Sequence, residues 1–174
     1  MENKQILYIS YDGMTDHLGQ SQVLPYLLGL IKEGYEFTIL SFEKKDRYEK
    51  NKHIIQKITD AAGIRWVPMT FSTRPPVVSK FYDAVRMQRK AFDLHQEQNF
   101  AMIHCRSYIA ANIGLKIKEK KGAKFFFDMR AFWADEKKHK HVKKNDTIAK
   151  LLTTIVRYLA DFKILITKNL HGRP

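Results

Sequence analysis

Residues 5–42 constrain the fold most, because they pass from a strand-like run through a polar loop and a helical segment to a second strand-like run. The loop carries Gly13 and Gly19, and the helix is expected to begin near Ser21, a good N-cap residue. Gly34 is placed to end the helix in a left-handed conformation. Two parallel strands joined by a helix put the loop at the carboxyl end of the sheet, where open α/β folds bind ligands.

The alternation of helices and strands continues along the rest of the chain. The pattern predicts further helices at 46–62, 77–98, 108–119 and 147–160, and strands at 64–69, 101–105, 125–127 and 163–166. We therefore predict an α/β fold, a doubly wound and mostly parallel sheet of about six strands with helices on both faces, as in Rossmann-like domains. A chain of 174 residues, 44% of them hydrophobic, is expected to form a single domain over residues 1–174.

The chain is strongly basic, with 31 Lys and Arg against 18 Asp and Glu and a net charge of +13. An anionic partner is expected, either nucleic acid, lipid headgroups or a phosphorylated small molecule. No apolar stretch approaches the roughly 20 residues of a membrane-spanning helix, and the start of the chain lacks the apolar core of a secretory signal. We expect a cytoplasmic protein in which the single Cys105 is reduced and inert.

The basic residues concentrate in segment 137–144, KKHKHVKK. It is either a solvated loop or a surface that attracts an anionic membrane or a substrate. Because no aromatic residue is interleaved, there is little on which nucleic acid bases could stack. His139 and His141 have no third ligand within sequence reach, so no metal site is expected.

Three groups of polar residues at strand ends are candidates for a binding site. In the loop at 12–22, Gly13 and Gly19 either bring backbone N–H groups close to a phosphate or sugar at the helix N-terminus or provide a turn with positive φ. The spacing matches neither a dinucleotide-binding GxGxxG motif nor a phosphate-binding Walker loop.

The second group follows the fourth predicted strand. Arg106, Ser107 and Tyr108 are placed to reach hydroxyls or a phosphate of a ligand, and Ser107 is alternatively the cap of the next helix. His104 is either a base or a buried core imidazole, and burial is the expectation, on the side of the strand opposite Arg106.

The third group follows the fifth predicted strand. Asp128 and Arg130 are two residues apart and face the same way if the strand persists, as a structural ion pair or as part of a site. Phe132 and Trp133 are either core residues, which we prefer, or a wall on which an acceptor stacks.

Three stretches of the chain are distinctive together: YDGMTDHLGQSQVLPYLLGLIKEGYEFTILSFEK, MIHCRSYIAA and FFFDMRAFWADE. They resemble the amino-terminal domain of family four GT-B glycosyltransferases. The resemblance covers nearly the whole chain, and its most specific parts are LGQSQVLPYL and FDMR. In this family two Rossmann-like domains face each other across a cleft, and the amino-terminal one chiefly holds the acceptor.

The resemblance implies that this chain is the acceptor-binding domain and that the carboxyl-terminal nucleotide-sugar domain is absent from it. The full enzyme would transfer a hexose from a nucleotide diphosphate sugar to a glycan or lipid-linked acceptor with retention, on the inner face of the membrane and without a cofactor, and the isolated chain would be inactive. It assigns no catalytic residue. The residues expected to bind substrate are Gly13, His17, Gly19, Gln20, Arg106, Ser107, Asp128 and Arg130.

One departure from the family concerns the chemistry. Several members carry a catalytically important histidine just past the fourth strand, where this chain has Arg106. A guanidinium group stays protonated and cannot act as a base, so Arg106 is expected to bind an acceptor group or the departing phosphate.

The alternative function is a non-catalytic Rossmann-like module that binds nucleic acid or another polyanion. The absence of aromatic residues from the Lys-rich segment 137–144 disfavours it. A nucleotide-dependent enzyme complete within this chain is disfavoured by the lack of a phosphate-loop motif.

Overall fold

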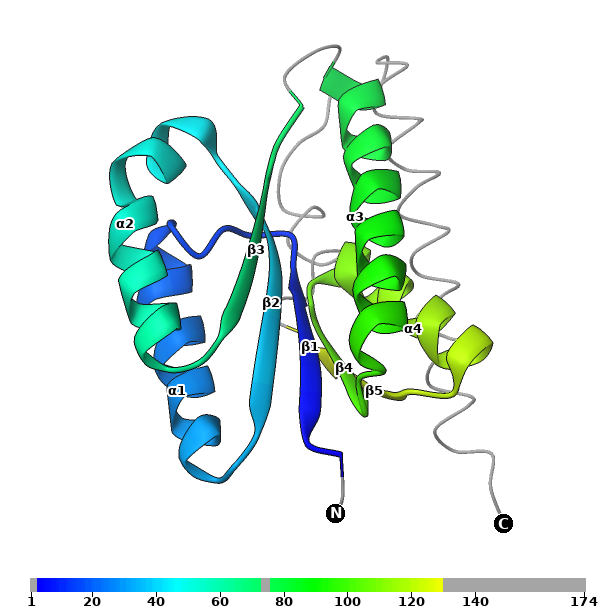
Figure 1. Cartoon of the computed structure of the whole chain (residues 1–174). Helices are drawn as coiled ribbons and strands as arrows, with labels where there is room; N and C mark the ends of the chain where they lie inside the picture. The colour runs from blue at the N-terminus through cyan, green and yellow to red at the C-terminus, as the bar shows by residue number, and fades with distance from the viewer. Residues whose placement is uncertain (1–2, 73–75, 130–174) are drawn as a thin grey trace. The chain divides into compact units, whose positions relative to one another are not determined.

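The computed structural model of the protein describes residues 3–72 and 76–129. These residues form one five-stranded sheet whose strands run parallel in the order β3-β2-β1-β4-β5 (Figure 1). The elements in chain order are β1 (Gln5–Ser10), η1 (Gly19–Val23), α1 (Leu24–Lys32), β2 (Glu36–Glu43), α2 (Lys45–Ala61), β3 (Arg65–Thr70), α3 (Pro76–Gln98), β4 (Met102–Arg106), α4 (Tyr108–Lys121) and β5 (Lys124–Asp128).

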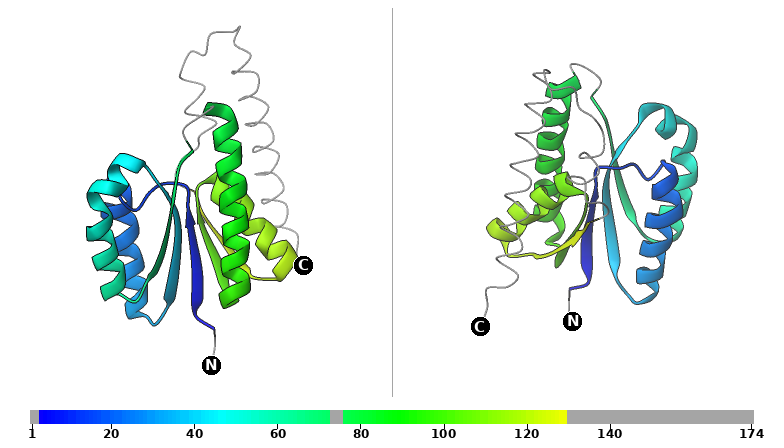
Figure 2. Two further views of the ribbon diagram at one scale, coloured as in Figure 1. Left: turned by 45° about the horizontal axis from the view of Figure 1, so that its top comes forward. Right: turned by 180° about the vertical axis from the view of Figure 1, so that it is seen from behind.

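The predicted α/β class with a doubly wound parallel sheet is confirmed, with five strands among the described residues. Helices α1 and α2 lie on one face of the sheet, and α3 and α4 lie on the other (Figures 1 and 2). The change of face falls between β1 and β4, which pair directly. This is the topological switch point, the place where open α/β sheets carry a ligand crevice at the carboxyl ends of their strands.

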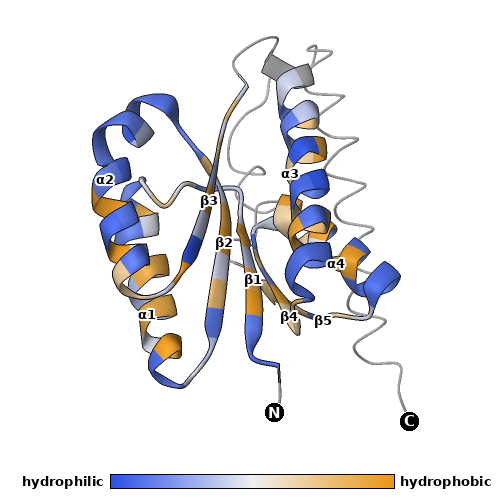
Figure 3. Cartoon of the chain, viewed as in Figure 1, coloured by the Kyte–Doolittle hydropathy of each residue, from blue (hydrophilic) through white to orange (hydrophobic). Residues whose placement is uncertain are grey.

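The core is built on β1, in which every residue from Ile6 to Ser10 is buried. Strands that are covered on both faces read as continuous apolar runs, which explains why β1 and β2 show little alternation. Hydrophobic residues follow the strands, whereas α2 is mostly hydrophilic (Figure 3). The buried cluster on the α1–α2 face contains Ile6, Tyr8, Met14, Val23, Leu24, Leu27, Phe37, Ile39, Ile55, Ile64 and Trp66.

The first helical segment begins earlier than predicted. The chain is helical from His17, passes through the π-helical turn η1 and continues as α1. The Ser21 hydroxyl donates to the backbone carbonyl of His17 at 2.8 Å. Ser21 is therefore inside the helical segment, and its prediction as the N-cap was wrong because the hydroxyl bonds back to the carbonyl four residues earlier. The left-handed conformation predicted for Gly34 is confirmed by its φ of 83°.

Several predictions lie outside the described residues. These are the helix at 147–160, the strand at 163–166, the Lys-rich segment 137–144, Arg130, Phe132, Trp133, His139 and His141.

Helix α4 lies close to the sheet at Gly114. A β-carbon at this position would collide with the sulfur of Cys105 on β4 and with the ring of Phe125 on β5. Burial raises the pKa of the Cys105 thiol, which therefore stays protonated, as expected of an inert core residue.

Replacing Gly114 by Ala should lower the free energy of unfolding by about 1–3 kcal/mol, because the added methyl group overpacks the interface between α4 and the sheet. Gly29 on α1 is the matched control, since a β-carbon there meets nothing within 4 Å. Gly29→Ala should raise the free energy of unfolding by about 0.5–1 kcal/mol. Urea unfolding followed by circular dichroism measures both, and equal effects of the two changes would contradict the packing argument.

Candidate functional site

A buried carboxylate holds the loop that follows β1. Glu43 is the last residue of β2 and is fully buried. It accepts hydrogen bonds from the backbone N–H groups of Met14 at 2.8 Å and Thr15 at 3.0 Å. The hydroxyls of Thr15 at 2.5 Å and Ser41 at 2.6 Å also donate to it. Sequence reasoning missed Glu43, although an acidic residue at the end of the mostly apolar run FTILSF was a usable signal.

The two glycines of this loop allow neighbouring atoms to pack closely against its backbone. Neither Gly13 nor Gly19 has a positive φ, so the interpretation as a positive-φ turn was wrong. A β-carbon at Gly13 would collide with the Glu43 carboxylate, and one at Gly19 would collide with the backbone of Gly13 and Met14. Both glycines are buried, and the N–H groups of Met14 and Thr15 bond to Glu43. These two N–H groups are therefore already used within the protein.

His17 and Gln20, the other two loop residues predicted to bind substrate, are exposed. The side-chain amide of Gln20 donates to the backbone carbonyl of Thr15 at 3.0 Å. The backbone of His17 accepts the Ser21 hydroxyl, as described above. Both residues lie where the loop after β1 enters the helical segment, at the carboxyl edge of the sheet.

Arg106, the last residue of β4, is a buried cation at the switch point, with 3% of its surface exposed. In register it pairs with Ser10 of β1 and Asp128 of β5. One guanidinium nitrogen, Nη2, donates to the side-chain oxygen of Gln22 at 3.3 Å. The other, Nη1, is buried and has no hydrogen-bond partner among residues 3–72 and 76–129. A buried cationic donor with spare capacity is suited to an anionic or strongly polar oxygen of a ligand.

Ser107 follows directly and has a strained backbone, with φ of 83° and ψ of 162°. This region of backbone conformations is essentially restricted to glycine. Ser107 occupies the predicted N-cap position of α4, where its backbone carbonyl accepts the N–H of Ala111 at 2.9 Å, but its hydroxyl makes no capping hydrogen bond. The hydroxyl is buried and also has no hydrogen-bond partner within the described part of the chain. Among the described residues, strain and an unsatisfied hydroxyl thus occur next to a guanidinium that has one unpaired nitrogen.

His104 is buried as predicted, among the rings of Tyr8, Phe126 and Tyr26 at centroid distances of 4.7, 4.7 and 5.8 Å. These contacts place it on the α1 face of the sheet, the face on which Arg106 reaches Gln22. The prediction that His104 faces away from Arg106 was wrong, because residues two apart on a strand share a face.

The predicted site residues on β4 and β5 lie together. Arg106 and Asp128 are direct neighbours across the two strands, and Ser107 is the next residue along the chain. Asp128 is partly buried. Burial of Tyr26 and, second to it, the nearby Asp128 carboxylate raise the pKa of the Tyr26 hydroxyl. Arg130, which follows Asp128 by two positions in the sequence, lies outside the described residues.

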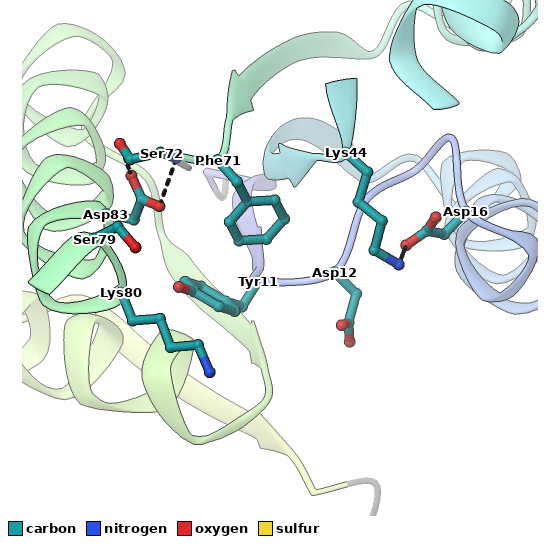
Figure 4. A pocket seen from close by; sticks show the side chains of 9 residues that line it. All are labelled: Tyr11, Asp12, Asp16, Lys44, Phe71, Ser72, Ser79, Lys80 and Asp83. Carbon is teal, nitrogen blue, oxygen red and sulfur yellow. Dashed lines mark hydrogen bonds and ion pairs between the residues drawn. The ribbon is translucent and has the colours of Figure 1, made fainter. Parts of the chain in front are cut away.

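A separate pocket of about 440 Å³ opens at the ends of β1, β2 and β3. Its lining includes none of the residues that the sequence assigned to substrate binding. Tyr11 and Phe71 form its aromatic centre, with Lys80 on one side and Asp12 on the other (Figure 4). The lining residues are Tyr11, Asp12, Asp16, Lys44, Phe71, Ser72, Ser79, Lys80 and Asp83.

Known proteins resemble this chain in fold and only weakly in sequence. No protein-family model matches the sequence. No curated protein matches it. The C-terminal domain of a hydrogenase from Pyrococcus furiosus superposes with a TM-score of 0.56 at 15% identity, over 74% of this chain and 94% of that domain. The likeness is one of fold.

Solved glycosyltransferases are also among the structural matches. A UGT protein of Arabidopsis thaliana, complexed with UDP-L-rhamnose, matches with a TM-score of 0.48 and 13% identity over 72% of this chain. A glycosyltransferase from Rickettsia africae matches with a TM-score of 0.47 and 14% identity over 82% of this chain. The chain covers 35% of the length of each.

Within the part of the chain that the structure describes, no helix is both long and apolar enough to cross a membrane.

Replacing Glu43 by Gln should destabilise the protein by about 2–3 kcal/mol, because an amide NH2 would face N–H or O–H donors that now bond to a carboxylate oxygen. Glu36→Gln, at the exposed start of the same strand, is the control and should change stability by less than about 0.5 kcal/mol. Urea unfolding gives the two values. Amide hydrogen exchange should become faster at Met14 and Thr15 in Glu43→Gln, and unchanged exchange there would refute the role of the carboxylate.

Replacing Ser107 by Gly should raise the free energy of unfolding by about 1 kcal/mol, because glycine adopts the observed backbone conformation without strain. Asn99, the other described non-glycine residue with positive φ, at 47°, provides the comparison. Asparagine tolerates that left-handed region, so Asn99→Gly should have an effect below about 0.5 kcal/mol. A loss of stability in Ser107→Gly, measured by thermal and urea unfolding, would show that the strain is absent in solution.

Proposed function

We propose that this chain is the acceptor-side domain of a GT-B glycosyltransferase, in which it binds a glycan or lipid-linked acceptor at the carboxyl edge of its sheet. The observation that carries the proposal is the buried guanidinium of Arg106 at the topological switch point, which has one nitrogen without a hydrogen-bond partner among residues 3–72 and 76–129. The loop after β1 and the FDMR strand end resemble family four enzymes in sequence. This resemblance supports acceptor binding as the role of the site.

Arg106 supplies binding and electrostatic stabilisation. Its side chain remains protonated, so it holds an anionic oxygen of the acceptor or of the departing phosphate and does not remove a proton. The Ser107 hydroxyl adds a second hydrogen bond from the adjacent residue. Keeping two polar groups in a strained segment without a partner in the described part of the chain costs stability, as is common at ligand sites.

The proposed reaction needs no strong base from this domain. The bond between the anomeric carbon and the leaving phosphate oxygen breaks while the acceptor oxygen bonds to that carbon on the same face. The acceptor proton passes to the phosphate oxygen. The carboxyl-terminal domain of the full enzyme would hold the nucleotide diphosphate sugar, and this domain would position the acceptor hydroxyl.

The test uses the full-length gene product that contains this chain. It is incubated with nucleotide diphosphate hexoses and with membranes or lipid-linked oligosaccharides, and release of nucleoside diphosphate and labelling of the acceptor are followed. Arg106→Ala should lower kcat/KM by about a hundredfold or more, the cost of losing a charged contact to the reacting groups. Arg65→Ala is the control, since Arg65 pairs with Glu97 on the surface at the start of β3 and should leave kcat/KM unchanged.

A second variant protects the test against misfolding, because Arg106 is buried. Ser107→Gly is expected to fold at least as well as the parent protein and to lose part of the transfer activity. Unchanged transfer in both variants, or no transfer from any nucleotide sugar, would overturn the proposal. Salt-dependent retention of RNA or DNA on filters would instead favour the polyanion-binding module.

A further inference from the structure

We propose that the pocket of about 440 Å³ bounded by Tyr11, Phe71, Asp12 and Lys80 is a binding site for a neutral pyranose unit of a glycan. It contains none of the residues assigned above to substrate binding. The inference rests on the proposed function in one respect, since it makes the bound saccharide part of the acceptor. The volume is within the range of about 300–1,000 Å³ typical of small-molecule sites.

The pocket has an aromatic surface that is fixed in place. The ring of Phe71 stacks on the ring of the buried Phe42, with 4.8 Å between the ring centroids. The ring of Tyr11 contacts both rings edge to face, with centroid distances of 5.4 Å to Phe42 and 5.2 Å to Phe71. The electron-rich faces of such rings attract the C–H groups on the apolar side of a sugar ring. A rigid aromatic surface also costs little side-chain entropy on binding.

Polar groups with spare hydrogen-bonding capacity surround these rings. The hydroxyl of Tyr11 is buried and has no hydrogen-bond partner among the described residues. Within residues 3–72 and 76–129, the carboxylate of Asp12 makes no hydrogen bond or ion pair, and neither does the ammonium group of Lys80. The Asp12 carboxylate can accept hydrogen bonds, the Lys80 ammonium group can donate them, and the Tyr11 hydroxyl can donate or accept. Neighbouring hydroxyl groups of a sugar need both donors and acceptors.

The remaining charges of the pocket are compensated within the protein. Asp16 pairs with Lys44 at 2.8 Å and with Arg47 at 3.2 Å. Asp83 accepts two hydrogen bonds from Ser72, and Arg86 lies 3.1 Å from its carboxylate. Within the part of the chain that the structure describes, one carboxylate and one ammonium group of the lining have no charged partner, at Asp12 and Lys80. A ligand without net charge therefore fits better than a polyanion.

A nucleotide fits less well, although Rossmann-like sheets often bind one at this edge. Its phosphates would lie against the loop after β1, where Glu43 already accepts the N–H groups of Met14 and Thr15. They would also face the carboxylates of Asp12 and Asp16, and like charges repel at short range. The same arrangement accepts uncharged hydroxyl groups.

The experiment titrates the 174-residue chain with the methyl glycosides of glucose, galactose, mannose and N-acetylglucosamine, and with maltose and lactose. Binding is followed by saturation-transfer NMR on the sugar and by amide shifts in the protein. We expect at least one saccharide to bind, with shifts at Tyr11, Asp12, Phe71 and Lys80. UMP and GMP serve as the competing ligands and should not displace it.

Two conservative variants test the contacts. Asp12→Asn should weaken saccharide binding at least about tenfold, because it removes a charged acceptor while keeping the size of the side chain. Tyr11→Phe keeps the aromatic surface and removes only the hydroxyl, so binding should weaken about three- to tenfold. The matched control is Asp93→Asn, an exposed acid on α3 that is absent from the pocket lining, which should not change the affinity.

Each outcome decides the inference. The inference would be overturned if no saccharide bound, or if UMP or GMP bound preferentially. It would also be overturned if Asp12→Asn and Tyr11→Phe left saccharide binding unchanged. Saccharide binding that both variants weaken would support it even if the full-length protein transfers no sugar, which would count against the proposed function alone. Glycosyl transfer without any effect of the two pocket variants would support the proposed function and reject this pocket.

Discussion

The Glu43 carboxylate is the interaction on which the carboxyl edge of the sheet depends. It is buried at the end of β2, and four donors from the loop after β1 and from β2 converge on it. A buried charge is tolerable only when it is satisfied to this degree. A side chain at Gly13 would collide with the carboxylate. The buried Glu43 therefore explains why this position is glycine, which the sequence alone also allowed as part of a phosphate-binding loop.

Most of the fold was predictable because it follows from local patterns. The apolar runs of β1 and β2, the helical spacing of α2 and α3, and the left-handed Gly34 each depend on neighbouring residues in the sequence. The start of the first helix was predicted wrongly, because the Ser21 hydroxyl bonds within the helix and does not cap it. Whether the hydroxyl caps the helix or bonds within it depends on how tightly the preceding loop turns. The general preference of serine for N-cap positions carries no information about that turn.

The candidate site was only partly predictable, for a related reason. Position at a strand end pointed to Arg106, Ser107 and Asp128, and the parallel register does bring them together. The strain at Ser107 is a property of the folded backbone and has no signature in the sequence. The pocket residues Tyr11, Phe71 and Asp83 come from three separate segments, and only the sheet order makes them neighbours.

The two parts of the carboxyl edge are joined through the loop that Glu43 holds. Ser10, the last residue of β1, is the register partner of Arg106, and Tyr11 and Asp12 follow it into the pocket. Met14 and Thr15, whose N–H groups donate to Glu43, follow two and three residues after Asp12. The same carboxylate therefore restrains the short segment that runs from the switch point to the pocket lining. A ligand that contacts both Arg106 and Asp12 would meet a preformed surface, and the energy of ordering that loop would already have been supplied by folding.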